Sequence, residues 1–94
     1  MMENRFRKKL EELGLKEAVR IGSCTAFDYG GMGVFYSIDE CKYGLCHVLS
    51  FIEAKDGKWY KPLLQKVKES FGKPEGSMLH DGIRYYFWKK VDEA

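Results

Sequence analysis

The sequence has no long apolar run. Its longest stretches without a charged residue, Tyr29–Ile38 and Tyr43–Ile52, are ten residues each, whereas a membrane-spanning helix needs about 20 apolar residues. The N-terminal segment MMENRFRKKLEELG is charged and has no apolar segment behind it, so no secretory signal is visible. We therefore expect a soluble, cytoplasmic protein that does not interact with membranes.

Cysteine and histidine are also scarce, with three and two residues respectively. An odd number of cysteines cannot all pair within one chain, and free thiols are the simplest state in a reducing compartment. Cys24, Cys41 and Cys46 with either His47 or His80 would match the ligand number of a Cys3His zinc site, but C-x4-C is not a usual zinc spacing. A zinc-stabilised domain is therefore only our third hypothesis, and we expect neither a metal nor a cofactor.

Familiar catalytic motifs are missing. The glycine-rich stretch DYGGMG is followed by strand-forming residues and by no Lys-Ser/Thr pair, which favours a hairpin turn over a phosphate-binding loop. No nucleophile elbow, metalloprotease helix or paired-carboxylate spacing is present. Cys46 and His47 are adjacent, and neighbours on a strand point to opposite faces. The sequence thus favours a non-enzymatic protein without excluding catalysis.

What the sequence does have is aromatic residues and an uneven distribution of charge. Aromatic residues make up 15% of the 94 positions, which suits one modest core in a single domain spanning residues 1–94. The formal net charge is only +2, but residues 55–90 carry nine basic side chains against four acidic ones. This basic C-terminal segment is a candidate contact surface for an acidic partner.

Apolar periodicity predicts two helices. The first lies between Asn4, a good N-cap residue, and Gly14, a typical C-terminal residue. The second begins near Pro62 and ends at Gly72. Basic residues lie on its outward side and flank: Lys61, Lys66 and Lys68.

The strand predictions are less uniform. Residues 18–27 have strand composition, and the residues after DYGGMG predict a further strand. The segment 38–55 supports two interpretations: helical apolar spacing with a capping box, or strands rich in β-branched and aromatic residues. We favour strands. The sequence KDG at 55–57, followed by KWY, is typical of a hairpin, and Asp81-Gly82 predicts a second hairpin near the C-terminus.

These elements predict an α+β fold, with a small antiparallel sheet of four or five strands and two helices packed mainly on one face. The expected order is α-β-β-β-α-β-β, or α-β-β-α-α-β-β if 38–55 is helical. In the strand interpretation, DECKYGLCH contains a turn at Lys42–Gly44, with Cys41 and Cys46 on its two sides.

The last predicted strand provides the candidate site, because successive residues alternate between two faces. One face is apolar enough for the core: Ile83, Tyr85 and Phe87. The other combines cationic and aromatic residues: Arg84, Tyr86, Trp88 and Lys90. Such residues occur in the hot spots of protein interfaces and in platforms that bind single-stranded nucleic acid. The alternative is that a helix covers this second face, so that Tyr86 and Trp88 belong to the core.

Our leading hypothesis is a small protein-binding module, namely a regulator, inhibitor or adaptor that acts through this aromatic and basic surface. The second hypothesis is a nucleic-acid-binding protein that combines the strand face with the basic residues of the second helix. The residues that would carry either function are Arg84, Tyr86, Trp88, Lys90, Lys61, Lys66 and Lys68.

Overall fold

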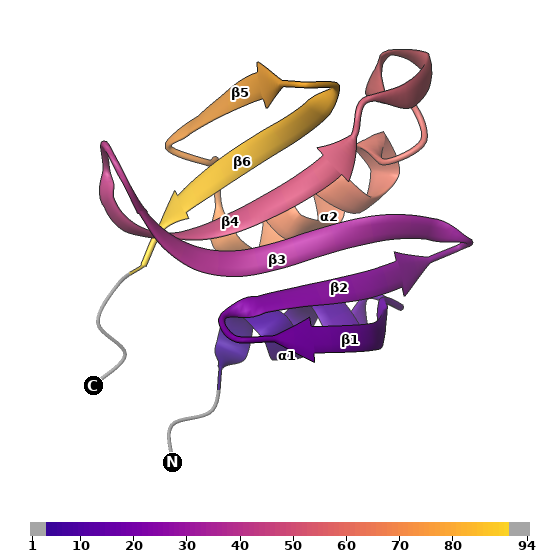
Figure 1. Cartoon of the computed structure of the whole chain (residues 1–94), viewed down its shortest axis with the longest axis horizontal. Coiled ribbons are helices and arrows are strands. Elements are labelled where there is room, and N and C mark those ends of the chain that lie inside the picture. The colour runs from indigo at the N-terminus through magenta and orange to yellow at the C-terminus, as the bar shows by residue number, and fades with distance from the viewer. Residues whose placement is uncertain (1–3, 91–94) are drawn as a thin grey trace.

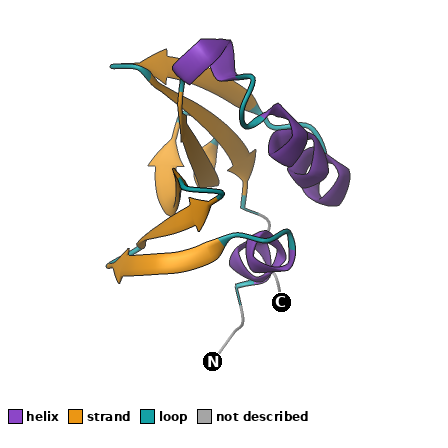
Figure 2. Cartoon of the chain, turned by 90° about the vertical axis from the view of Figure 1, so that its right-hand side faces the viewer, coloured by secondary structure: helices purple, strands orange, loops and turns teal. Residues whose placement is uncertain are grey.

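The protein is a two-layer structure in which one antiparallel sheet carries two α-helices on the same face. The computed structural model describes residues 4–90, which form two α-helices, one 3-10 turn and six strands (Figures 1 and 2). In chain order these are α1 (Arg5–Glu12), β1 (Lys16–Ile21), β2 (Cys24–Tyr29), β3 (Met32–Cys41), β4 (Gly44–Ile52), η1 (Ala54–Gly57), α2 (Lys61–Phe71), β5 (Gly76–His80) and β6 (Ile83–Lys89).

The strands lie in the order β1-β2-β3-β4-β6-β5, and all neighbours are antiparallel. The α+β class is therefore confirmed, but the sheet has six strands among the described residues instead of the four or five expected. The ends of the predicted domain, residues 1–3 and 91–94, lie outside the described residues.

The additional strand comes from a turn within the segment 18–27, which we expected to be one strand. The chain reverses at Gly22 and Ser23, so that β1 pairs with β2. Gly22 has φ +60°, a left-handed conformation that glycine adopts without a steric penalty and that two-residue hairpin turns require. A Gly-Ser pair between two strand-forming runs is itself a hairpin signal, so the prediction of one strand over 18–27 is wrong at this point.

The strand interpretation of 38–55 is confirmed, since β3 and β4 form a hairpin that turns at Lys42 and Tyr43. The hairpin expected at 55–57 is wrong: η1 leads directly into α2. Gly57 has φ +74°, and a Cβ atom there would lie 2.5 Å from the Tyr60 hydroxyl. The ring of Tyr60 is buried against Phe51, with 4.2 Å between ring centroids. This packing directs the chain towards the helical layer instead of back along the sheet.

Both helices form where the periodicity predicts them. The Asn4 Oδ1 atom accepts a hydrogen bond of 2.8 Å from the Arg7 backbone N–H and so caps α1. At the end of α2, Gly72 has φ +83°, and its N–H donates to the Lys68 carbonyl at 2.7 Å. These local signals fixed the helix boundaries because each cap satisfies backbone groups that the helix itself leaves unpaired.

The core lies between the sheet and the two helices. From the helices it takes the fully buried side chains Phe6, Leu10, Leu63 and Val67. From the sheet it takes Phe27, Val34, Tyr36, Leu49 and Phe51. The middle of one face of the sheet thus belongs to the core, and the other face is left without a helical cover among the described residues (Figure 2).

Candidate functional site

The strand face that we expected to bind a partner points into the core. Trp88 is only 4% exposed, and its indole N–H donates to the carbonyl of Gly72 at 2.9 Å. Tyr86 pairs across the sheet with the buried Leu49 and contacts the rings of Phe51 and Tyr60. Of the two interpretations of β6 given above, the structure therefore shows the alternative, in which a helix covers this face and Tyr86 and Trp88 belong to the core. The physical reason is that this face offers the large Trp ring a helix to pack against and its N–H a hydrogen-bond acceptor.

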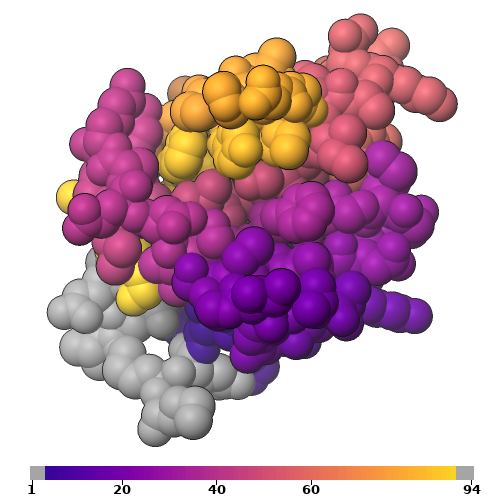
Figure 3. Space-filling view, in the orientation of Figure 1, coloured from indigo at the N-terminus to yellow at the C-terminus, as the bar shows by residue number. Residues whose placement is uncertain are grey.

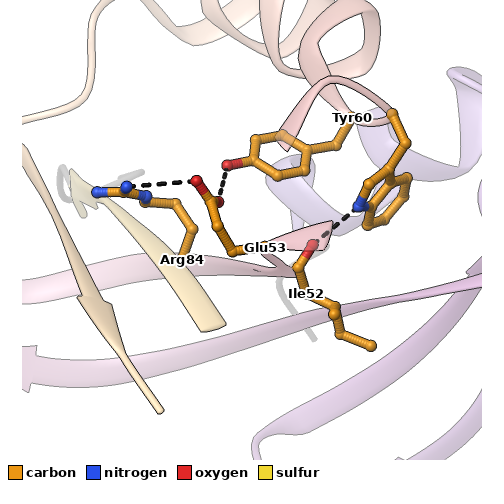
Figure 4. Close-up of polar contacts among 5 residues, drawn as sticks. Ile52, Glu53, Tyr60 and Arg84 are labelled. Atoms are coloured by element: carbon orange, nitrogen blue, oxygen red, sulfur yellow. Dashed lines mark hydrogen bonds and ion pairs between the residues drawn. The ribbon is translucent and has the colours of Figure 1, made fainter. Parts of the chain in front are cut away.

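Arg84 is held by a carboxylate on the same side of the sheet (Figure 4). Its guanidinium donates to Glu53 Oε2 at 3.3 Å, while the Tyr60 hydroxyl donates to Glu53 Oε1 at 2.5 Å. The hydrogen bond from Tyr60, followed by the Arg84 interactions, lowers the pKa of Glu53 against the opposing effect of burial. Burial, followed by the bond to Glu53, raises the pKa of Tyr60. Arg84 therefore contributes to a structural cluster at the end of β4.

The seven predicted site residues do not form one surface. Lys61 and Lys66 are exposed on α2, and Lys68 is half-buried. Tyr86 contacts Tyr60 at the start of α2 and Trp88 bonds to Gly72 at its end, so the helix lies over the strand face and covers it. Lys90 is half-buried at the end of the described residues, where its backbone N–H donates to the Leu45 carbonyl.

The opposite face of the sheet carries an apolar band that crosses every strand. Cross-strand partners share a face, and the observed register places ten apolar side chains on this side: Val19, Ile21, Ala26, Phe35, Val48, Ile52, Met78, Ile83, Tyr85 and Phe87. We call these residues the apolar band. Ile83, Tyr85 and Phe87, which we assigned to the core, therefore lie on the face that no described helix covers. Figure 3 views the molecule from this side, with atoms of β6 in yellow.

Most of the large apolar side chains that reach solvent belong to this band. Among the described residues, seven large hydrophobic side chains are exposed. Five of them lie in the apolar band, and their exposed fractions run from 36% for Phe35 to 73% for Ile21. Exposed apolar residues scattered singly are ordinary on a protein surface, but a contiguous group marks an interaction site.

The band contains a shallow depression of about 290 Å³. Its walls are the side chains Cys24, Phe35, Ser37, Ser50, Ile83 and Tyr85. Ser50 and the neighbouring Val48 are 7% and 5% exposed, although no described helix lies on this side. The aromatic rings of the apolar band therefore shield the centre of this sheet face from solvent, and they form the rim of the depression.

Charged residues on this face lie at its margins. Lys16 and Asp28 pair at one end of β1 and β2. At the other end, Asp39 on β3 and Lys89 on β6 are the two cross-strand neighbours of Cys46 on β4, so both lie on this face. Both signs of charge are present at the margins, while the residues between them are apolar or small and uncharged. An apolar centre with a polar rim is the usual anatomy of a protein–protein interface.

The β3–β4 turn closes one end of the band. The ring of Tyr43 lies 6.3 Å from that of Phe87, and a Cβ atom at Gly76 would overlap the Tyr43 hydroxyl. Glycine at position 76 thus allows the turn to fold against β5 and β6. The same turn holds the two thiols predicted to flank it: Cys41 is half-buried, Cys46 is buried, and their Sγ atoms are 2.8 Å apart.

The metal and catalytic candidates are distributed over both faces. Within residues 4–90, no group of three or more His, Cys, Asp or Glu side chains comes together in a way that could hold a metal ion. His47 faces the helices, where its Nδ1 lies 2.7 Å from the Tyr36 hydroxyl and its ring stacks on Phe6. Cys46 and His47 lie on opposite faces, as the strand pattern predicts. His80 lies 3.2 Å from Asp81 at the exposed β5–β6 turn.

A second hollow lies between the two helices. It has a volume of about 550 Å³ and is lined by Arg5, Lys8, Lys9, Glu12, Glu69, Ser70 and Phe71. The mixture of cations and carboxylates leaves little net charge in it.

No α-helix among the described residues is long and apolar enough to span a membrane.

Comparison with known proteins finds no matching family model, no similar curated protein and no similar solved structure. The evidence for a function therefore comes from the residues of this chain.

The sequence could have indicated the apolar band only if the face of the last strand with Ile83, Tyr85 and Phe87 had been assigned to the surface. The alternation was visible, but the identity of the covered face was not.

Proposed function

We propose that this protein is a protein-binding module that acts through the apolar band. The single observation that carries the proposal is the concentration of exposed apolar side chains on the sheet face that none of the described helices covers. This keeps the protein-binding role that the sequence favours and moves it to the opposite face of the sheet. A regulator, inhibitor or adaptor would act in this way, by contact and without chemistry of its own.

The partner that fits is a second, different protein whose contact surface is apolar at its centre and carries both signs of charge at its rim. Lys16 and Lys89 would face acidic groups of that partner, and Asp28 and Asp39 would face basic ones. Aromatic residues such as Phe35 and Tyr85 supply the large, rigid contact area that dominates binding energy at interfaces. The central depression is open and about 290 Å³ in volume, which suits one projecting side chain of the partner better than an enclosed small ligand.

Site-directed photo-crosslinking tests this proposal. A benzophenone amino acid is placed at Phe35 in the apolar band, and in a matched protein at Gln65, which is exposed on the helical side. After irradiation in cells of the native host, we expect a discrete covalent adduct with one other protein from position 35 and none from position 65. The partner is then identified by mass spectrometry.

A second pair of variants separates specific contact from general adhesion. We expect Met78→Glu to reduce the adduct from position 35 at least about tenfold, because burying an unpaired charge at an interface costs several kcal/mol. Lys66→Glu, on α2, should leave it unchanged. Equal adducts from both positions, or no adduct from position 35, would contradict the proposal. An adduct between two copies of this chain would contradict the proposal of a different protein and would identify a second copy of the chain as the partner.

Nucleic-acid binding remains a competing proposal in a reduced form. The strand residues Tyr86 and Trp88 lie under α2, so only the basic residues of the helical layer stay available. Among these, Lys61 and Lys66 are exposed. Such a surface would bind phosphates through charge alone, and its affinity would fall steeply with salt.

A further inference from the structure

The hairpin formed by β3 and β4 brings two cysteine side chains together. Cys41 and Cys46 lie on the same face of the sheet as the apolar band, because Cys41 pairs with Gly44 and Cys46 with Asp39. They are therefore diagonal neighbours, which in a regular ladder are usually too far apart for a covalent bridge. Here their Sγ atoms are 2.8 Å apart, so only a small approach separates them from a disulfide bond of about 2.05 Å.

The two thiols differ in access. Cys41 is half-buried near the turn, and its Sγ also lies 3.4 Å from the Gly44 carbonyl. Cys46 is fully buried. Burial, followed by the contact with Cys41, raises the pKa of the Cys46 thiol to about 12. Cys46 therefore stays protonated while Cys41 meets solvent, and a reagent reaches Cys41 first.

The turn that carries Cys41 is held against the rest of the sheet. The ring of Tyr43 packs near Phe87 and over Gly76. This contact fixes the end of the hairpin and keeps the two sulfur atoms side by side. Fixed neighbouring groups react with each other much faster than with dissolved reagents, because the entropy of bringing them together has already been lost.

We propose that Cys41 and Cys46 form a dithiol–disulfide site that exchanges with low-molecular-weight disulfides such as oxidised glutathione. Cys41 attacks one sulfur of that disulfide as a thiolate, forms a mixed disulfide and releases one small thiolate. Cys46 then attacks the Cys41 sulfur and passes its proton to the departing small thiolate, which forms the internal bond and releases the second small thiol. The two protein thiols are oxidised, the small disulfide is reduced, and the two protons end on the released thiols.

This site is independent of the proposed protein partner. It lies at the end of the apolar band and consists only of residues of this chain, so it can be tested on the purified protein. Cys24, the other cysteine, is exposed and would form mixed disulfides of its own. The test therefore uses the Cys24→Ser protein, in which only the two neighbouring thiols remain.

The experiment equilibrates Cys24→Ser protein with glutathione buffers of increasing oxidised fraction, followed by acid quenching, alkylation and mass spectrometry. We expect a main product lighter by two hydrogen atoms, at least about tenfold more abundant than the glutathione adduct. Lys42 lies between the two cysteines, so trypsin separates their peptides and a linked pair identifies the bond. The oxidised protein should melt about 5–10 °C higher than the reduced one.

Two variants test the order of the steps. With Cys46→Ala, the adduct on Cys41 cannot resolve and should accumulate. With Cys41→Ser, the buried Cys46 should react at least about tenfold more slowly than Cys41 does. A product carrying only glutathione, or equal reactivity of both thiols, would overturn the proposal. Should Cys46→Ala fail to fold, limited maleimide labelling of the Cys24→Ser protein measures the same reactivity difference without that variant.

Discussion

At the scale of single residues, Glu53 is the centre of a polar cluster, because its carboxylate accepts two side-chain hydrogen bonds. Its carboxylate accepts hydrogen bonds from the Tyr60 hydroxyl and the Arg84 guanidinium, which come from different parts of the chain (Figure 4). Its side chain is 18% exposed, so solvent screens these interactions only in part. The cluster connects the end of β4 with the start of α2 and with β6.

This cluster predicts a pH dependence of stability. The pKa of Glu53 is lowered in the folded protein, so the native state binds fewer protons than the unfolded chain around the ordinary glutamate pKa of about 4.3. The stabilisation is therefore present above that pH and is lost as the pH falls through the lowered value. We expect Glu53→Gln to reduce the free energy of unfolding by about 1–2 kcal/mol at neutral pH.

The difference between wild type and Glu53→Gln should shrink as the pH is lowered below about 4. Urea unfolding at neutral and acidic pH measures it. Glu40→Gln is a suitable control because Glu40 is exposed on β3, and its substitution should change the stability by less than about 0.5 kcal/mol at either pH. A constant difference for Glu53→Gln across the pH range would show that its charge is not what stabilises the cluster.

At the scale of elements, the two faces of β6 differ in their surroundings: one packs in the core, and the other lies in the apolar band. Trp88 is fixed in the core by its bond to Gly72, whereas Tyr85 forms an edge of the depression in the apolar band. The alternating pattern of the strand shows that two faces exist. It does not show which of them meets a helix, because both are aromatic.

Alanine substitutions on the two faces of β6 test this assignment. Trp88→Ala removes a buried ring and leaves the Gly72 carbonyl without this donor, so we expect the free energy of unfolding to fall by about 3–5 kcal/mol. Tyr85→Ala, on the other face, should lower it by about 1 kcal/mol. Urea denaturation followed by far-UV circular dichroism gives both values. A larger loss for Tyr85→Ala than for Trp88→Ala would reverse the assignment.

At the scale of the whole molecule, the fold separates charge from apolar surface. The helical layer carries exposed cations such as Lys61 and Lys66, while the sheet layer carries the apolar band on its outer side. Both helices lie on one side of the sheet (Figures 1 and 2), so the two surfaces face opposite sides of the molecule. One partner of moderate size would therefore meet only one of them.

This separation gives an expectation for nucleic acid. Because Tyr86 and Trp88 pack under α2 and the other aromatic residues of β6 face away from it, binding of short DNA or RNA oligomers should be weak at low salt and should vanish at moderate salt. Fluorescence anisotropy at the two salt concentrations measures this, with Lys61→Glu and Lys66→Glu as variants. Binding that resists salt would contradict this expectation and also the charge-only form of the competing proposal, because it would require contacts other than those to phosphates.

The sequence by itself determined the elements whose signals are local. Asn4 and Gly72 fixed helix ends because caps act within a few residues of the backbone groups they satisfy. Asp81 and Gly82 fixed the last hairpin because both adopt positive φ, at +50° and +75°, as its turn requires. The turn at Gly22 and Ser23 also has a local signal, a Gly-Ser pair between two strand-forming runs, but strand composition over 18–27 was interpreted as one strand.

Only the tertiary structure decided which side of the sheet is covered. The register that joins β4 to β6 places Trp88 and Tyr86 beside His47 and Leu49, under the helices. A shift of one residue would invert every side chain of the strand, and the alternation within β6 does not by itself decide between the two arrangements. The choice depends on contacts with residues far along the chain, such as Gly72 and Tyr60, and these contacts exist only once the helices pack on the sheet.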